Sequence, residues 1–167
     1  MTNQTAPETN TQALKRAALA KFLDEDQENI SVSQYDSSLF DVGYSKLGSH
    51  LVLTDTSKGF VLRYSKLSSY LVLTDTEADE RARESILDLV WAFKPDFLES
   101  HTGVDASVFK VLQQKMYEDA NCAILKLIED KDHFVDDAIL SDGRGHSLAQ
   151  YDNEENEEGP FFIYRID

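Results

Sequence analysis

The sequence predicts an α+β domain in which one antiparallel sheet, made of a duplicated β-hairpin and a C-terminal strand, carries about five helices packed on one face. Three observations support this fold class. A 20-residue segment occurs twice in tandem, apolar residues recur at helical spacing after the second copy, and the chain ends in an apolar run of strand length. The 167 residues suit a single domain, which we place at residues 11–167, after a polar tail of residues 1–10 that we expect to be mobile.

The tandem repeat is the most distinctive feature of the sequence. Residues 44–56 recur as residues 64–76 with eleven of thirteen positions identical, and the full units span 40–59 and 60–79. Each unit has the pattern of a strand, a tight polar turn and a second strand. Because solenoids need at least about three repeats, two units predict a duplicated hairpin within one sheet instead.

One helix is predicted before the repeat. Leu14, Ala18 and Phe22 recur every four residues and predict a single apolar stripe on a helix over residues 12–23. Ile30 and Val32, with Tyr35 as an extension of the same pattern, predict a short strand with alternating faces.

The remaining helices are predicted after the repeat. Thr74 or Thr76 is expected to cap a helix that runs to about Phe93, and a loop is expected at residues 101–103. Asp105 is expected to cap the next helix, and two further helices follow a break. The residues expected on the buried faces of these helices are Ile86, Leu87, Val90, Trp91, Val108, Val111, Leu112, Ile124, Leu127, Ile128, Phe134, Ala138 and Ile139.

The C-terminal part changes character. Two glycines predict a loop at residues 142–146, and a strand is expected at residues 148–151. An acidic turn at residues 152–160 then leads to an apolar strand at residues 161–166. These segments predict a C-terminal hairpin that closes onto the sheet.

The net charge of −15 is the strongest bulk signal of function. Such a field repels nucleic-acid phosphates, so direct DNA or RNA binding is not expected. It attracts basic surfaces, including the nucleic-acid grooves of other proteins. The plainer explanation is that acidity keeps the protein soluble.

The compartment is predicted from cysteine content and apolar runs. No apolar run approaches the roughly 18 residues of a membrane helix, and the N-terminus lacks the apolar core of a signal peptide. The single cysteine, Cys122, cannot form an internal disulfide, which fits a reducing compartment. We therefore expect a cytoplasmic protein without a membrane partner, with Cys122 as a buried helical thiol.

Four segments carry a resemblance to a known group of proteins. Taken as a set, Tyr70–Glu80, Asp142–His146, Tyr151–Asn156 and Phe162–Arg165 resemble small acidic proteins encoded by tailed phages and prophages. The resemblance covers most of the chain from Tyr35 onward. It implies a phage gene product that acts in the cytoplasm of a bacterial host, and the group has no assigned activity. That group has one Leu-Val-Leu-Thr-Asp segment, whereas this chain has two.

The segment from Asp142 to His146 is the best local candidate for a ligand-binding or catalytic loop. Its glycines let backbone amides approach a ligand, and Arg144 between them could hold a carboxylate or phosphate with two hydrogen bonds. His146 could transfer a proton, with Asp142 orienting it. The alternative is a structural turn in which Arg144 forms a salt bridge. We assign no residue as catalytic.

A second candidate is a metal site on one helix. Glu129, His133 and Asp137 lie four residues apart and would share one helical face, a spacing that can hold a divalent ion. The segment contains many acids, so a solvated helix face explains the spacing better. His101 has no evident partner in the sequence. We therefore predict no metal site and no cofactor.

Residues 152–158 form the densest acidic run and contain no basic residue. The predicted partner-binding residues are the five acids of this run, Asp152, Glu154, Glu155, Glu157 and Glu158. The alternative is a hydrophilic hairpin tip.

The expected function is that of an acidic phage-type protein that binds a host protein with a basic surface and can inhibit it, for example by mimicking nucleic-acid charge. The absence of a strong catalytic motif favours binding over catalysis. The alternatives are a small enzyme or ligand-binding protein that uses the Asp142–His146 loop, and a protein with a purely structural or assembly role.

Overall fold

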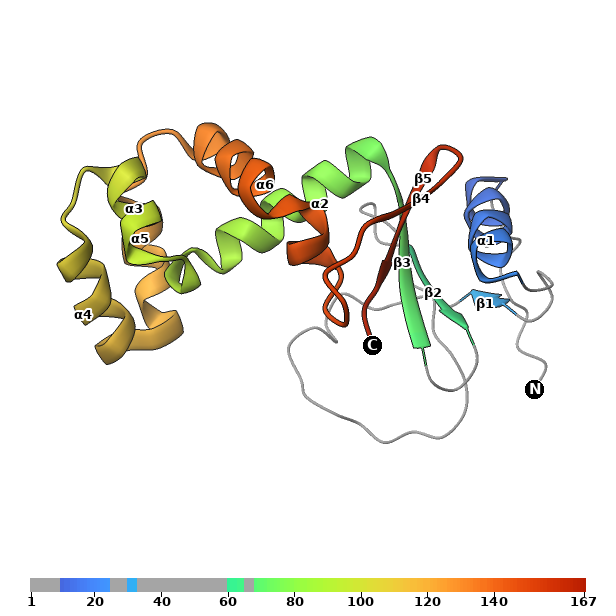
Figure 1. Cartoon of the computed structure of the whole chain (residues 1–167), viewed down its shortest axis with the longest axis horizontal. Coiled ribbons are helices and arrows are strands. Elements are labelled where there is room, and N and C mark those ends of the chain that lie inside the picture. The colour runs from blue at the N-terminus through green and yellow to red at the C-terminus, as the bar shows by residue number, and fades with distance from the viewer. Residues whose placement is uncertain (1–9, 25–29, 33–59, 65–67) are drawn as a thin grey trace, which may run out of the picture.

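The computed structural model describes residues 10–24, 30–32, 60–64 and 68–167. They form an elongated molecule with a sheet at one end and a group of helices at the other (Figure 1). We call these the sheet end, formed by α1 (Asn10–Leu23) and the strands, and the helical end, which runs from Val90 to Ala138. Two helices, α2 (Asp75–Asp88) and α6 (Lys131–Leu148), lie side by side and join the two ends. Residues 1–9 of the predicted tail lie outside the described residues.

The sheet is antiparallel, with the strand order β1-β2-β3-β5-β4. Its strands are β1 (Ile30–Val32), β2 (Phe60–Tyr64), β3 (Ser68–Thr74), β4 (Asn156–Glu158) and β5 (Phe161–Arg165). The second copy of the repeat forms the β2–β3 hairpin, with Phe60 paired with Val72, as its pattern predicts. A C-terminal hairpin closes onto the sheet as predicted, because β5 pairs with both β4 and β3, but its first strand, β4, lies within the predicted acidic turn. The first copy lies outside the described residues, so the duplicated hairpin stays a prediction.

Helices cover both faces of the sheet. On one face, Val72 belongs to a core cluster with Leu19 of α1. On the other face, the next residue along β3, Leu73, belongs to a cluster with Ala78 of α2 and Leu148 of α6. Neighbouring residues of a strand point to opposite faces, so both faces of β3 are buried. The coarse α+β prediction is confirmed, whereas the packing of all helices on one face is not.

Helix α1 buries a different face from the predicted one. Leu14 and Phe22 of the expected stripe are exposed, whereas Lys15 and Leu19 are fully buried. Lys15 can be buried because its Nζ lies 2.6 Å from Oε2 of Glu77. Of the predicted stripe only Ala18 is buried, so the stripe was wrong in part, because hydropathy alone does not show that a lysine will have such a partner.

Helix α2 begins with a capping box at the end of β3. The Thr74 side chain accepts a hydrogen bond from the Glu77 backbone N–H, while the Glu77 carboxylate accepts one from the Thr74 backbone N–H. This confirms Thr74 as the predicted cap. Burial opposes ionisation of Glu77, but the hydrogen bonds from Lys15 and Thr74 outweigh it and lower the pKa of Glu77.

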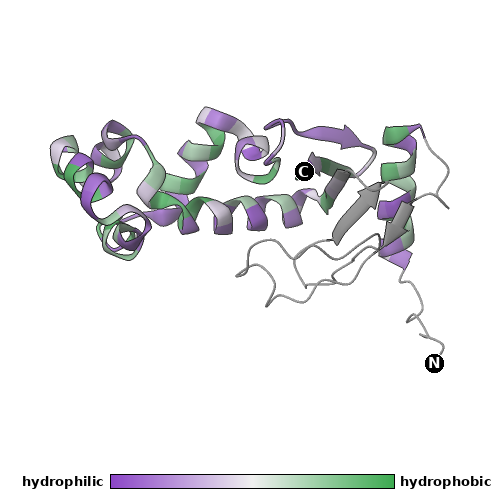
Figure 2. Cartoon of the chain, turned by 90° about the horizontal axis from the view of Figure 1, so that it is seen from below, coloured by the Kyte–Doolittle hydropathy of each residue, from purple (hydrophilic) through white to green (hydrophobic). Residues whose placement is uncertain are grey.

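The helical end contains short helices around one core. They are η3 (Val90–Ala92), α3 (Pro95–Thr102), α4 (Ala106–Met116), η4 (Tyr117–Ala120) and α5 (Asn121–Leu125). The loop predicted at residues 101–103 was wrong in part, because α3 continues through Thr102 and ends at Gly103. Figure 2 shows hydrophobic and hydrophilic bands alternating along these helices, as in amphipathic helices.

The core of the helical end differs in part from the predicted one. Ile124 and Ile128 are buried as predicted, but Leu127 is exposed. In α4 the Asp105 cap is confirmed, whereas the predicted burial of Val108 and Val111 was wrong. Apolar residues occur on several sides of α4, and the larger ring of Phe109 occupies the core in their place. Cys122 is exposed, in contrast to the predicted buried thiol.

Helix α6 contains the segment predicted as a loop. The helix continues across a kink at Gly143, where φ is 75° and ψ is 162°, conformations that only glycine adopts readily. Leu148 ends the helix, so the strand predicted at residues 148–151 was wrong; a turn takes its place. None of the helices in the described part of the chain combines the length and apolar character that a bilayer span requires.

Candidate functional site

Arg144 lies at the centre of an ion-pair network that joins three segments of the chain. Its Nη1 lies 2.8 Å from carboxylate oxygens of both Asp75 and Asp79 at the start of α2. Its Nε and Nη2 donate to the two carboxylate oxygens of Glu155, at 2.9 and 3.0 Å. The guanidinium carbon also lies 4.4 Å from the centre of the Phe162 ring. These contacts leave the Arg144 side chain only 11% exposed.

The same network shifts the ionisation of its members. The hydrogen bond with Glu155, followed by those with Asp75 and Asp79, raises the pKa of Arg144. Burial opposes ionisation of Glu155, but the bonds from Arg144 and from the Tyr164 hydroxyl at 2.6 Å outweigh it and lower the Glu155 pKa. Burial and the bond to Glu155 raise the pKa of Tyr164. The fixed charges of this network therefore remain in place at neutral pH.

The candidate ligand residues Asp142, Arg144 and His146 do not converge on a common site. Asp142 and His146 are exposed, and no hydrogen bond or ion pair joins them within the described structure. Gly145 allows a close approach of backbones, since a Cβ there would lie 2.4 Å from the Asn153 carbonyl oxygen. The geometry matches the structural alternative for this segment, because all three nitrogens of the Arg144 guanidinium already donate hydrogen bonds to carboxylates of this chain.

The acidic run of residues 152–158 is divided between internal and outward-facing groups. Glu155 pairs with Arg144, and Glu158 pairs with Lys21 of α1. Asp152, Glu154 and Glu157 are exposed and have no ion-pair partner among the described residues. Figure 2 shows β4 and the segment before it as hydrophilic. Three of the five predicted partner-binding acids therefore remain available to a partner.

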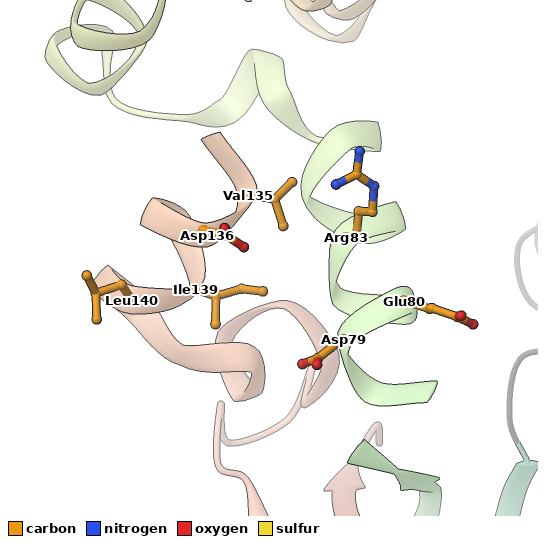
Figure 3. Close-up of a pocket in the computed structure, with 7 residues that line it drawn as sticks. All are labelled: Asp79, Glu80, Arg83, Val135, Asp136, Ile139 and Leu140. Carbon is orange, nitrogen blue, oxygen red and sulfur yellow. The ribbon is translucent and has the colours of Figure 1, made fainter. Parts of the chain in front are cut away.

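An open groove runs between α2 and α6, with a volume of about 450 Å³. Figure 3 shows Val135 and Ile139 pointing from α6 toward α2, and Asp79 pointing from α2 toward α6. Glu80 and Leu140 project outward at the two edges (Figure 3). The groove thus has an apolar floor and carries carboxylates along its length.

The charges around this groove are only partly neutralised. Asp79 is paired with Arg144, and Arg83 is paired with Asp132 in the first turn of α6. Glu80 and Asp136 are both exposed and have no ion-pair partner in the described ranges. The sequence reasoning did not predict this groove, because its two helices are separated by more than 40 residues along the chain.

The structure brings together part of the candidate metal cluster. His133 and Asp137 lie on adjacent turns of α6, as their spacing predicts, and His101 of α3 joins them in place of Glu129. No local pattern indicates His101 as the third member, because α3 approaches α6 only through tertiary packing.

Comparisons with protein-family models, with curated proteins and with solved structures find no significant match to this chain. The candidate sites therefore rest on their own geometry.

Proposed function

We propose that this protein binds another protein by accepting a basic, amphipathic segment of that partner in the groove between α2 and α6. The observation that carries the proposal is two exposed carboxylates, Glu80 and Asp136, which line a groove with an apolar floor and have no ion-pair partner among the described residues. A Lys or Arg side chain of the partner would meet these carboxylates. An apolar side chain of the same segment would cover Ile139, which is partly exposed above the buried Val135.

The apolar part of the groove supplies affinity. Leu140 is 85% exposed at its edge, and covering an apolar side chain of this size contributes about 1.5–3 kcal/mol. The carboxylates and the net charge of −15 mainly raise the association rate and select basic partners. Together they favour a segment with both kinds of residue over one that is only basic.

Because the chain resembles small acidic phage proteins, we propose a bacterial host protein as the partner. A host segment that combines basic and apolar residues is typical of nucleic-acid-binding surfaces, so its capture would inhibit that host protein. The exposed acids Asp152, Glu154 and Glu157 form a second surface that could contact the same partner by charge alone.

A peptide-binding experiment tests the groove. A fluorescently labelled helical peptide of Lys and Leu is compared, by fluorescence anisotropy, with a peptide in which Ser replaces every Leu. We expect the Lys/Leu peptide to bind more tightly. The double variant Glu80→Gln with Asp136→Asn should weaken its binding by about tenfold, since each lost charge pair contributes on the order of 0.7 kcal/mol.

Two matched variants make this result specific. The variant Glu154→Gln with Glu157→Gln removes the same charge from the hairpin and should change the affinity by less than about twofold. Leu140→Ser should weaken binding of the Lys/Leu peptide and leave the Lys/Ser peptide unaffected. Equal losses from the groove and hairpin variants, with no preference for the Lys/Leu peptide, would show that binding follows net charge alone and would refute the groove.

A further inference from the structure

We propose that His101, His133 and Asp137 form a binding site for a divalent transition-metal ion, for which Zn²⁺ is the best match. The Nε2 atoms of both histidines lie 3.6 Å from the same carboxylate oxygen, Oδ2 of Asp137. One ligand atom from each residue lies within 4.8 Å of the other two. Three potential ligands thus converge from two helices on a small volume.

These distances suit an ion better than direct contact. A hydrogen bond between an imidazole nitrogen and a carboxylate oxygen is about 2.7–3.2 Å long, so 3.6 Å is too long for one. Ligand atoms about 2.0–2.1 Å from a tetrahedral Zn²⁺ are separated from each other by roughly 3.4 Å. The two histidine–aspartate separations of 3.6 Å are close to this value, and the ligand atoms of the two histidines, which lie within 4.8 Å of each other, would draw together around the ion.

The surrounding packing holds the ligands in place. His101 is in the last turn of α3, and its side chain is only 7% exposed. Its ring centroid lies 4.6 Å from that of Phe97 and 5.1 Å from that of Phe134. His133 and Asp137 are separated by one turn of α6, which places them on one face of that helix. A site whose ligands are already positioned loses little conformational entropy on binding.

The ligand types indicate the class of ion. Two imidazole nitrogens with one carboxylate oxygen favour Zn²⁺ and related transition metals, whereas Mg²⁺ and Ca²⁺ prefer all-oxygen sites. His133 is exposed and Asp137 is partly exposed, so solvent reaches the cluster from one side. Three protein ligands with an open side are typical of a Zn²⁺ site that keeps a water molecule. The ion would also link α3 to α6 across the helical end.

The test is calorimetric titration of the full chain with Zn²⁺ in the presence of excess Mg²⁺, which occupies nonspecific acidic sites. All proteins carry Cys122→Ser, because the exposed thiol could itself bind zinc. We expect one Zn²⁺ per chain with micromolar or tighter affinity, and a rise in Tm with Zn²⁺ but not with Mg²⁺.

The variants separate this site from other zinc ligands. His133→Ala and Asp137→Asn replace exposed or partly exposed side chains, so they should fold, and each should weaken Zn²⁺ binding by at least about tenfold. His146→Ala removes an exposed histidine outside the cluster and should leave the affinity unchanged. Equal Zn²⁺ affinity in all three variants, or affinity weaker than millimolar in the parent protein, would overturn the proposal.

Discussion

The sheet end and the helical end of this molecule are stabilised by different kinds of polar contact. Where α2 and α6 meet the sheet end, charged groups connect distant segments: buried Lys15 pairs with Glu77, and Arg144 links α2, α6 and the C-terminal hairpin. At the helical end, the neutral amides of Asn121 and Gln113 connect segments. Asn121 accepts a hydrogen bond from the Trp91 backbone N–H and donates to the Leu87 carbonyl oxygen. The two ends should therefore respond differently to changes in charge.

The difference follows from how each end is built. The sheet end joins segments from both ends of the chain, and its ionic contacts span 62 to 69 residues at Lys15–Glu77 and Arg144–Asp75. The helical end is one continuous stretch packed around Phe109, Phe134 and neighbouring apolar side chains. Local packing forms readily, whereas a few buried ion pairs determine which distant segments come together.

The largest expected effect comes from Arg144→Met. It leaves Asp75, Asp79 and Glu155 without their shared cation, and we expect a loss of about 3 kcal/mol in the free energy of unfolding. Arg83→Met is the matched control, because Arg83 is 41% exposed and pairs only with Asp132 in the described structure. It should cost less than about 1 kcal/mol. Urea denaturation followed by circular dichroism measures both.

Arg144→Met also tests whether the two ends unfold together. Trp91 is the single tryptophan and lies in the helical end, so its fluorescence reports on that end. If the sheet end is the weaker unit in the variant, hydrogen exchange in β3 and β5 should accelerate before Trp91 fluorescence changes. Equal losses in the Arg144 and Arg83 variants would contradict the contrast between the two ends.

The second-largest effect is expected from acid, which should destabilise the sheet end. The pKa values of Glu77 and Glu155 are lower in the folded protein than the ordinary value of 4.5, so their stabilisation is complete above about pH 4.5 and is lost as the pH falls through the folded values. Asp105, the exposed cap of α4, also has a lowered pKa because Ser107 donates to it. Hydrogen exchange measured between pH 7 and pH 3 should show that protection decreases first at the sheet end.

The variant Glu77→Gln makes this prediction specific. It should be less stable than the parent protein at pH 7, and the difference should shrink as the pH falls below about 4.5, where Glu77 becomes protonated in the parent as well. A difference that stays constant down to pH 3 would show that Glu77 acts through its shape and not through its charge.

The fold class and most element positions could be predicted from the sequence because they depend on local patterns. Thr74 and Asp105 cap helices through bonds to residues two or three positions away, and Phe161 to Arg165 is a nearly continuous apolar run of strand length. The burial of Lys15 could not be predicted in this way, because it depends on a glutamate 62 residues further along the chain. The proximity of His101 to His133 and Asp137 could not be predicted either, because it also arises from a contact between helices that are distant in the sequence.

The Asp142–His146 segment shows a second limit of local patterns. Two glycines suggest a loop, yet here one of them permits a kink in a helix and the other permits close contact with the Asn153 backbone. Arg144 lies between these two glycines, and the contact at Gly145 depends on the segment that follows the helix. The salt-bridge alternative was visible in the sequence, but its partners Asp75 and Asp79 were not.

The smallest expected effect is that of deleting the first repeat unit, residues 40–59. In the sheet, β1 already pairs with β2 from Ile30–Tyr64 to Val32–Leu62, and antiparallel neighbours can be joined by short connections. The deletion leaves every described helix and strand in the chain, including the paired β1 and β2, and residues 33–39 remain to connect these two strands. We therefore expect an unchanged Trp91 signal and an unfolding free energy within about 0.5 kcal/mol of that of the parent protein.

Deleting residues 60–79 instead is the matched control, since it removes the other near-identical copy. The first copy carries Ser57 where the second carries Glu77, so this deletion removes both the capping box of α2 and the partner of Lys15. A cap contributes about 1 kcal/mol, and a buried lysine without a partner costs more, so this variant should be much less stable. Comparable losses from the two deletions in urea denaturation would show that the first copy also supports the fold. Retention of stability by the first deletion alone would locate the structural role of the repeat in the second copy, residues 60–79.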